Sequence, residues 1–207
     1  MQISTNQRLL TGFLQSYFGF EINAVVSNER RQQNAGTLND KEDIGKRRKQ
    51  GRKCLRSLAG NSFKHGMYQV NKIKFPHRSS SLSYSGTAVA AVFSPYRKIR
   101  GIGVDIELNR TMPEGAEKLL LSARETALMR HHSGLCGGEL LRIWTVKEAL
   151  LKSDPLNEKT GWLTAYELLK PYHRTGEAVL KKRKCGKQFR YISFKIGTGY
   201  LSFAVCL

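Results

Sequence analysis

The sequence predicts an α+β fold built from two similar α/β halves, residues 1–100 and 101–207. Short runs of small and β-branched residues, typical of strands, flank a Gly-Thr pair at 86–87 and another at 197–198. Apolar residues also recur at helical spacing, most regularly over residues 139–152. Strand pairs combined with helices in this way indicate two comparable α+β units in one chain.

The first half begins with a short amphipathic helix, predicted from apolar residues at helical spacing within residues 1–20. Residues 27–53 are polar and lack apolar periodicity, so we predict a loop there. A basic cluster follows, because seven of the eleven residues from 46 to 56 are Lys or Arg. Most such clusters are solvated surface. The cluster consists of Lys46, Arg47, Arg48, Lys49, Arg52, Lys53 and Arg56.

The second half opens with a strand at 101–107, in which apolar residues alternate with Gly, Asp and Glu. Ser122 and Glu125 have the spacing of a capping box and predict the start of a helix. A longer helix is predicted over 139–152, and the Asp-Pro pair at 154–155 ends it. This longer helix carries the most informative residues of the chain.

Charge limits the partners that the protein can have. The 207 residues include 35 Lys and Arg against 16 Asp and Glu, a formal net charge of +19 and a pI near 10.1. The partner is therefore expected to be anionic: nucleic acid, a membrane surface, a phosphorylated small molecule or an acidic protein. The first residues lack a signal-peptide pattern and no later stretch is long and apolar enough to span a bilayer, so we expect a cytoplasmic protein without a membrane partner.

Two carboxylates in the 101–107 strand suggest a cation site. Asp105 and Glu107 are two residues apart and should point to the same side of a strand. Neighbouring carboxylates repel each other unless a cation lies between them or both are well hydrated. Exposed alternation would also explain the pattern, but acids are scarce in this chain. A hard divalent ion such as Mg²⁺, which takes further ligands from water and phosphate, suits such a pair.

The helix at 139–152 offers matching side chains. Trp144, Glu148 and Lys152 follow one another at i, i+4 and i+8, which places them along a single helix face. A Glu four residues before a Lys is also a common surface pair worth only about 0.2–0.5 kcal/mol. Taken alone, the helix therefore does not define a site.

Taken together, the two segments resemble a known family. GIGVDIE at 101–107 and RIWTVKEALLK at 142–152 resemble the signature motifs of the 4′-phosphopantetheinyl transferases, a G-[IV]-D-x-E strand followed by a W-[ST]-x-K-E-[AS]-x-x-K helix. SLSYSG at 81–86 is similar to the third motif of that family, usually Ser-His-Ser-Gly, and LSARETAL at 121–128 to the segment before the helix motif. The length is similar to that of the larger, Sfp-like class, in which one chain forms two halves related by a pseudo-twofold.

The resemblance implies an activity and a metal site. Members of the family transfer 4′-phosphopantetheine from coenzyme A to a serine of an acyl or peptidyl carrier protein and release 3′,5′-ADP, as holo-[acyl-carrier-protein] synthases do in fatty acid, polyketide or nonribosomal peptide synthesis. The resemblance implies that Asp105, Glu107 and Glu148 bind magnesium. It also implies that Glu148 is the base and that Lys152 stabilises negative charge. The expected partner is an acidic carrier protein, and the enzyme is expected to be a monomer.

The resemblance also implies contacts with coenzyme A. Lys147 and Lys152 would face its phosphates, and Ser83 and Tyr84 would lie near its 3′-phosphate. Tyr84 stands where the family usually has a histidine, so it would donate a neutral hydrogen bond in place of a charged one. Within the basic cluster, the residues that would bind the 3′-phosphate are Lys46, Arg47, Arg48 and Arg52.

Two other classes of function remain possible from the residues alone. A nucleic-acid-binding protein would account for the pI, the basic cluster and a second basic run, KKRKCGKQFR at 181–190. The basic runs lack interleaved aromatic residues, however, and the chain has no zinc-finger, RNP or P-loop pattern. A metal-dependent nuclease would use the acidic residues but would leave the complete helix motif unexplained. No nucleic acid partner is therefore expected.

Overall fold

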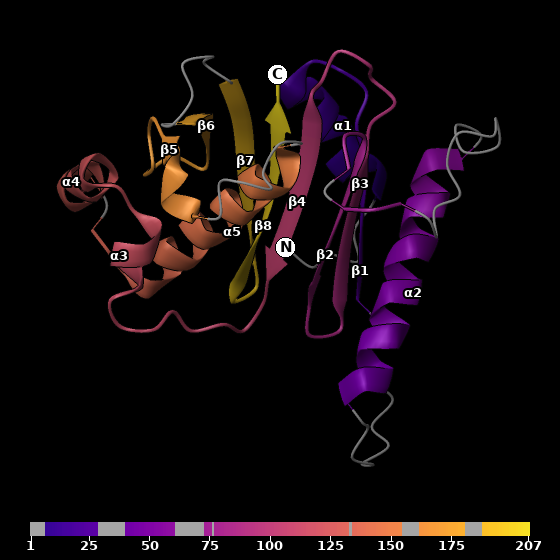
Figure 1. Cartoon of the computed structure of the whole chain (residues 1–207), viewed down its shortest axis with the longest axis horizontal. Helices are drawn as coiled ribbons and strands as arrows, with labels where there is room; N and C mark the ends of the chain where they lie inside the picture. The colour runs from indigo at the N-terminus through magenta and orange to yellow at the C-terminus, as the bar shows by residue number, and fades with distance from the viewer. Residues whose placement is uncertain are drawn as a thin grey trace.

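The structure is a computed structural model, which describes residues 7–28, 40–60, 73–75, 77–132, 134–154, 162–180 and 188–207. The described part contains two antiparallel sheets and several helices, a mixed α+β fold as predicted (Figure 1).

The first sheet has the order β1-β3-β2, with β1 Asn23–Asn28, β2 Ser80–Ser85 and β3 Ala88–Phe93. The second has the order β4-β8-β7-β6-β5, with β4 Gly101–Glu107, β5 Tyr166–Leu168, β6 Thr175–Leu180, β7 Gln188–Ile196 and β8 Gly199–Cys206. The helices are α1 Gln7–Phe18, α2 Asp40–Ala59, α3 Ala116–Leu120, α4 Ala123–His132 and α5 Gly137–Ser153, with a 3₁₀ turn, η4, at Leu163–Ala165.

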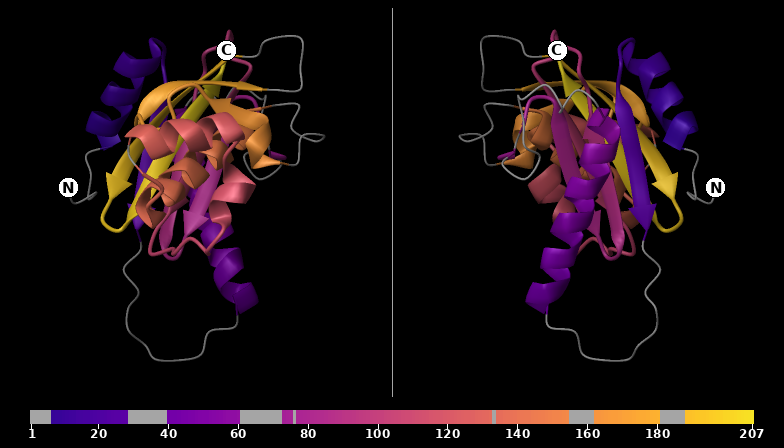
Figure 2. Two further views of the ribbon diagram at one scale, coloured as in Figure 1. Left: turned by 90° about the vertical axis from the view of Figure 1, so that its left-hand side faces the viewer. Right: turned by 90° about the vertical axis from the view of Figure 1, so that its right-hand side faces the viewer.

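The elements form layers in the order α2, first sheet, second sheet, α5 (Figures 1 and 2). Alternate residues of β3 explain this order: Ala91 and Phe93 pack in the core under α2, while Ala90 and Val92 pack against β4 and β8. Helix α1 covers the latter core at one end through Leu14. The second sheet therefore lies between α5 on one face and the first sheet with α1 on the other.

The predicted helices of the second half are confirmed. The capping box at the start of α4 is formed, because Ser122 Oγ accepts a bond from the Glu125 N–H at 3.2 Å and the Glu125 carboxylate accepts one from the Ser122 N–H at 2.8 Å. Helix α5 covers the predicted 139–152 segment with two extra residues at its start and one at its end. The predicted amphipathic helix near the N-terminus is α1.

The prediction of a loop over 27–53 is wrong where the chain is described. Its first two residues end β1, and helix α2 begins at residue 40; residues 29–39 lie outside the described part. The apolar side chains that pack α2 on the sheet, Leu55 and Leu58 above all, come after residue 53. Lys, Arg and Gln also have high helix propensity, so a charged segment can continue a helix whose apolar contacts lie at one end.

A ladder of serine side chains joins the two sheets. Residues at alternate positions of β2 point at the edge of β4, and their hydroxyl oxygens accept hydrogen bonds from backbone N–H groups that would otherwise pair with a neighbouring strand. The pairs of this serine ladder are Ser81 with Val104 at 3.1 Å, Ser83 with Ile106 at 3.3 Å and Ser85 with Leu108 at 2.8 Å. The edge of β4 is therefore satisfied by side chains, and β2 is held against it.

The two predicted halves share a core. Strands of the first sheet all precede residue 94 and those of the second follow residue 100, close to the predicted boundary between 1–100 and 101–207. One apolar cluster nevertheless contains side chains from both sheets, such as Val92 and Phe203. The sheets have three and five strands, and the pseudo-twofold relation and the division into two domains stay predictions. Within the described residues, no helix is long and apolar enough to cross a membrane.

Candidate active site

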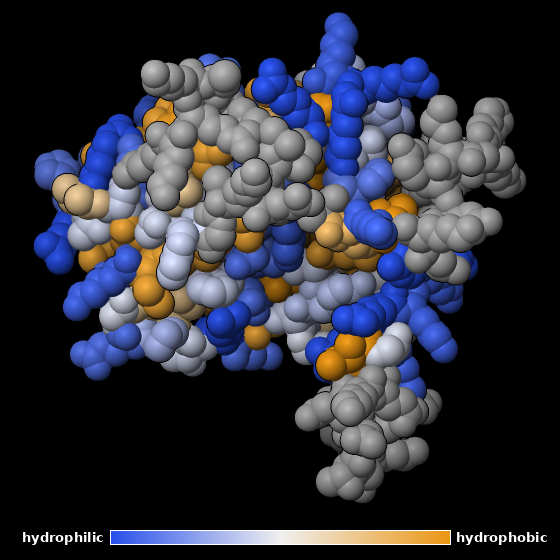
Figure 3. Space-filling view, in the orientation of Figure 1, coloured by the Kyte–Doolittle hydropathy of each residue, from blue (hydrophilic) through white to orange (hydrophobic). Residues whose placement is uncertain are grey.

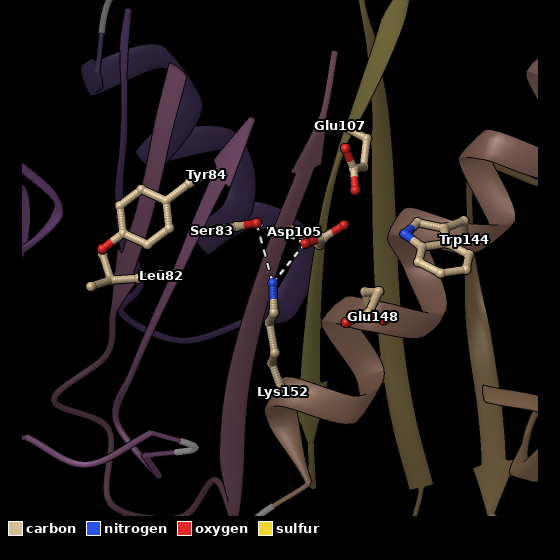
Figure 4. Close-up of a pocket in the computed structure, with 8 residues that line it drawn as sticks. All are labelled: Leu82, Ser83, Tyr84, Asp105, Glu107, Trp144, Glu148 and Lys152. Atoms are coloured by element: carbon tan, nitrogen blue, oxygen red, sulfur yellow. Dashed lines mark hydrogen bonds and ion pairs between the residues drawn. The ribbon is translucent and has the colours of Figure 1, made fainter. Parts of the chain in front are cut away.

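A pocket of about 450 Å³ opens where β2, β4 and α5 meet (Figure 4). Strand alternation directs both carboxylates of β4 into it, and helical spacing directs a row of α5 side chains at them. Segments far apart in the sequence therefore form one acidic pocket. Its lining residues are Leu82, Ser83, Tyr84, Asp105, Glu107, Trp144, Glu148 and Lys152.

Close approach of β4 and α5 keeps the two sets of side chains together. A Cβ atom on Gly103 would overlap the Ala149 carbonyl oxygen and lie 2.8 Å from the Ser153 backbone nitrogen. Only glycine permits this approach without a shift of backbone. The glycine at this position therefore sets how near the α5 side chains come to the β4 carboxylates.

The carboxylate of Asp105 is held on one side only. Its Oδ1 accepts a hydrogen bond from Ser83 Oγ at 2.7 Å and forms an ion pair with Lys152 Nζ at 2.6 Å. Asp105 is 5% exposed, and its buried Oδ2 has no hydrogen-bond partner among the described residues. A buried carboxylate oxygen without a donor is costly, so this atom is a candidate ligand for a cation.

Glu107 forms an ion pair with Arg110, a residue outside the predicted site. Arg110 donates to Glu107 Oε1 at 2.7 Å, and its guanidinium lies 4.5 Å from the centre of the Trp144 ring. The turn that returns Arg110 to the pocket contains Asn109 in the left-handed region, with φ 53°. In the sequence, this pair is visible only as ELNR, a Glu three residues before an Arg. That spacing predicts an ion pair only when the left-handed residue between them is known.

The ionised form of Glu148 is disfavoured in this pocket. Burial raises the pKa of its carboxyl, and the charges of Asp105 and Glu107 raise it further, while Lys152 and Arg110 act in the opposite direction. A third carboxylate therefore faces two others with only basic side chains to offset the charge. This arrangement favours either proton uptake by Glu148 or binding of a cation.

The residues present fit a hard divalent cation. Among the described residues, no three His, Cys, Asp or Glu side chains converge as a ready-made metal centre. The Asp105 and Glu107 carboxylates are instead engaged by Lys152 and Arg110. The donors are all carboxylate oxygens, and the buried, unpaired Oδ2 of Asp105 is one of them, which is the donor chemistry that Mg²⁺ prefers.

Tyr84 lies on the opposite side of β2 from Ser83 and packs on α2. A Cβ atom on Gly51 would collide with its hydroxyl. Burial raises the pKa of the Tyr84 phenol, and the charges of Arg52 and Arg48 oppose that rise, so both arginines lie near the ring. None of the four predicted basic ligands lines the pocket itself, and the coenzyme A contacts of Lys46, Arg47, Arg48 and Arg52 stay predictions.

The prediction that Lys147 faces the coenzyme A phosphates needs correction. Its side chain is fully buried, and Nζ donates to Glu125 Oε2 at 2.8 Å and to the Leu120 carbonyl. Position 147 is one residue from Glu148 and so about 100° around the helix, which turns it away from the pocket and toward α4. Lys147 is therefore part of the core of the second half.

Carboxylates and basic side chains that meet in one pocket are typical of sites that bind phosphate esters together with a divalent cation. A family model described as the 4′-phosphopantetheinyl transferase superfamily (ACPS) matches residues 101–203, about half of the chain. The chain belongs to this superfamily, whose members use coenzyme A and Mg²⁺; the Sfp-like class stays a prediction. No curated protein matches the chain closely enough to count as a relative. The match includes β4, α5 and most of β8, whereas α2 and the serine ladder lie outside it.

Proposed function

We propose that this protein transfers 4′-phosphopantetheine from coenzyme A to a serine of an acyl or peptidyl carrier protein, the reaction of a holo-[acyl-carrier-protein] synthase, and releases 3′,5′-ADP. The observation that carries the proposal is the meeting of Asp105, Glu107, Glu148 and Lys152 in one pocket of a chain from this superfamily. The donor set supports Asp105, Glu107 and Glu148 as the residues that hold magnesium. When bound, the ion neutralises charge on the diphosphate.

In the proposed reaction, the serine oxygen forms a bond to the β-phosphorus of coenzyme A as the bond from that phosphorus to the bridging oxygen breaks. The bridging oxygen leaves with its electron pair on 3′,5′-ADP. Glu148 is the candidate base for the serine proton, because its carboxylate lines the pocket in which the phosphate would react. Lys152 brings a positive charge to the same pocket, which stabilises the negative charge that develops on the phosphate.

The direct test incubates the protein with coenzyme A, Mg²⁺ and an apo carrier protein, followed by intact mass of the carrier. We expect Asp105→Ala and Glu148→Ala each to abolish transfer while the melting temperature stays close to wild type. Glu177→Ala, which removes an exposed carboxylate on β6, is the matched control and should transfer normally. Wild-type rates in either pocket variant at saturating Mg²⁺ would refute the assignment.

The outward surface of α2 supports an acidic partner. Hydrophilic residues gather along this helix in the space-filling view (Figure 3), and the exposed ones include Lys49, Lys53 and Arg56. Such a surface steers acidic carriers and nucleic acids alike. We expect the KM for the carrier to rise with salt while kcat is preserved. Cleavage of nucleic acid by the protein with Mg²⁺ would favour the nuclease instead.

A further inference from the structure

Adjacent residues of β2 face different parts of the molecule. Ser83 points at the edge of β4, whereas the Tyr84 hydroxyl lies against Gly51 of α2. In Figure 4, Ser83 points toward Asp105 and the Tyr84 ring points away from it. Both residues line the pocket, but side chains alternate along a strand, so their polar ends point in opposite directions from β2. The resemblance implies that both lie near the 3′-phosphate of coenzyme A, whereas the contacts of Ser83 are with the carboxylate pocket.

The Ser83 hydroxyl uses its full hydrogen-bonding capacity within the protein. A hydroxyl has one donor hydrogen and two acceptor lone pairs. Ser83 Oγ donates to Asp105 Oδ1 at 2.7 Å, and it accepts from the Ile106 N–H at 3.3 Å and from Lys152 Nζ at 3.2 Å. No donor hydrogen is left for a phosphate oxygen while these bonds persist.

The Asp105 carboxylate is oriented by this contact. Its Oδ1 is fixed by Ser83 and Lys152, and Ser83 is itself fixed by the backbone of β4. The second oxygen, Oδ2, is buried without a hydrogen-bond partner among the described residues and points toward Glu107 (Figure 4). One oxygen is thus anchored and the other is left for a ligand.

We propose that Ser83 is a positioning residue that orients Asp105 for a divalent cation and is not a ligand of the 3′-phosphate. Hydrogen-bond partners of metal ligands fix the ligand's orientation, and their loss typically lowers metal affinity about 10–100-fold. The identity of the cation as Mg²⁺ rests on the proposed function, but the role of Ser83 toward Asp105 does not.

The serine ladder supplies a matched control. Ser81 is buried to the same degree, 3% exposed against 4% for Ser83, and its hydroxyl accepts the same kind of backbone bond, from Val104. No bond from Ser81 to a carboxylate is seen in the described residues. Ser81→Ala and Ser83→Ala should therefore cost similar stability, and only Ser83→Ala should alter the metal site.

The experiment measures binding of Mn²⁺ to the full chain without coenzyme A, by electron paramagnetic resonance, and repeats it with Mg²⁺ by calorimetry. We expect Ser83→Ala to weaken Mn²⁺ binding about 10–100-fold and Ser81→Ala to bind as wild type. A second readout is the ratio of the dissociation constants of coenzyme A and 3′-dephospho-coenzyme A, which Ser83→Ala should leave unchanged. If the alanine variant does not fold, Ser83→Cys, with a weaker donor of similar size, should also bind Mn²⁺ less tightly than wild type.

Three results would overturn the proposal: wild-type Mn²⁺ affinity in the Ser83 variants, equal weakening in Ser81→Ala, or absence of Mn²⁺ binding to the wild-type chain. A change in the dissociation-constant ratio in Ser83→Ala would restore the 3′-phosphate role. Failure of the proposed function looks different. If only the proposed function fails, the wild-type chain binds Mn²⁺ in a Ser83-dependent way but does not modify a carrier protein.

Discussion

The helices α2 and α5 cover opposite sides of the molecule, and they meet their sheets in different ways. Helix α5 lies against β4 at backbone distance, because Gly103 has no side chain, and most of its residues are buried. Helix α2 contacts the first sheet through Leu55, Leu58 and their neighbours near its C-terminal end, while its earlier turns carry exposed basic residues. The two sides are thus built for different tasks.

The difference agrees with the division of the site that we predict. The carboxylates and Lys152 come from β4 and α5, where tight packing fixes their separation. The side chains beside Tyr84 come from α2, whose long basic residues can adapt to an anionic ligand. The family match covers only the first of these sides. We infer that the reacting groups on β4 and α5 need a fixed geometry. The predicted coenzyme A contacts on α2 need only positive charge and a suitable shape.

The largest expected effect concerns two lysines of α5. Lys147→Met leaves the buried Glu125 carboxylate without its cation, so we expect a loss of about 3–5 kcal/mol in the free energy of unfolding. Lys152→Met removes a side chain that is 29% exposed but takes the cation from the buried Asp105 carboxylate, to which Ser83 still donates. We expect it to cost less stability than Lys147→Met and to slow transfer. Urea unfolding and single-turnover assays measure both. Normal stability of Lys147→Met with weakened coenzyme A binding would return Lys147 to the pocket.

The contact between β4 and α5 should be nearly as sensitive. In Gly103→Ala the new methyl group meets the α5 backbone, which cannot move aside as a side chain can, so we expect a loss of about 1–3 kcal/mol and slow transfer. Gly137→Ala adds a methyl group to the same helix in open space and should stay within about 0.5 kcal/mol of wild type. Equal effects of the two changes on unfolding would show that the close approach does not order the site.

Local periodicity made half of the site predictable. Two-residue spacing in a strand and four-residue spacing in a helix decide which way Asp105, Glu107, Glu148 and Lys152 point, whatever surrounds them. The contacts of Lys147 and Arg110 depend on partners distant in space or on a left-handed turn, which no short pattern encodes. Sequence spacing therefore predicts direction, and only the fold predicts partners.

The fold was predictable to a similar extent. The helices α1, α4 and α5 have apolar or capping signals within their own residues. Helix α2 does not, since its apolar side chains lie in its last turns, and the serine ladder depends on which strand happens to lie beside β4. Edge-to-edge contacts of this kind are tertiary features, and the Ser-x-Ser-x-Ser pattern alone does not reveal them.

A moderate effect is expected where α2 meets Tyr84. Alanine is favoured over glycine within a helix by about 0.5–1 kcal/mol, so Gly45→Ala, with open space around it, should stabilise the protein by about that amount. Gly51→Ala should lose this gain because its methyl group displaces the Tyr84 hydroxyl, the far end of a movable side chain. Thermal unfolding distinguishes the two. An equal gain from both would mean that Tyr84 is not held against α2.

The smallest expected effect concerns the charge of Glu148 and its dependence on pH. Because burial and the neighbouring carboxylates raise the folded-state pKa of Glu148 above its ordinary value of 4.5, the folded protein binds the proton more tightly than the unfolded chain does. The resulting stability is present below the ordinary value and is lost as pH rises through the raised folded value. Ionised Glu148 is therefore a net cost to the metal-free protein at neutral pH.

Glu148→Gln removes that charge and keeps the shape of the side chain. In the presence of a chelator we expect the variant to melt above wild type at about pH 7.5 and level with it at about pH 4, where Glu148 is protonated in both folded and unfolded chains. Excess Mg²⁺ at the higher pH should raise the melting temperature of wild type more than that of the variant, because a ligand that binds only the folded state stabilises it according to its affinity. Lys152→Met supplies the opposite control. Because Lys152 lowers the pKa of Glu148, its loss should enlarge the difference in melting temperature between glutamine and glutamate at position 148. A difference between variant and wild type that is the same at both pH values would show that the charge of Glu148 is already compensated, and the acidic pocket would then need no cation to balance it.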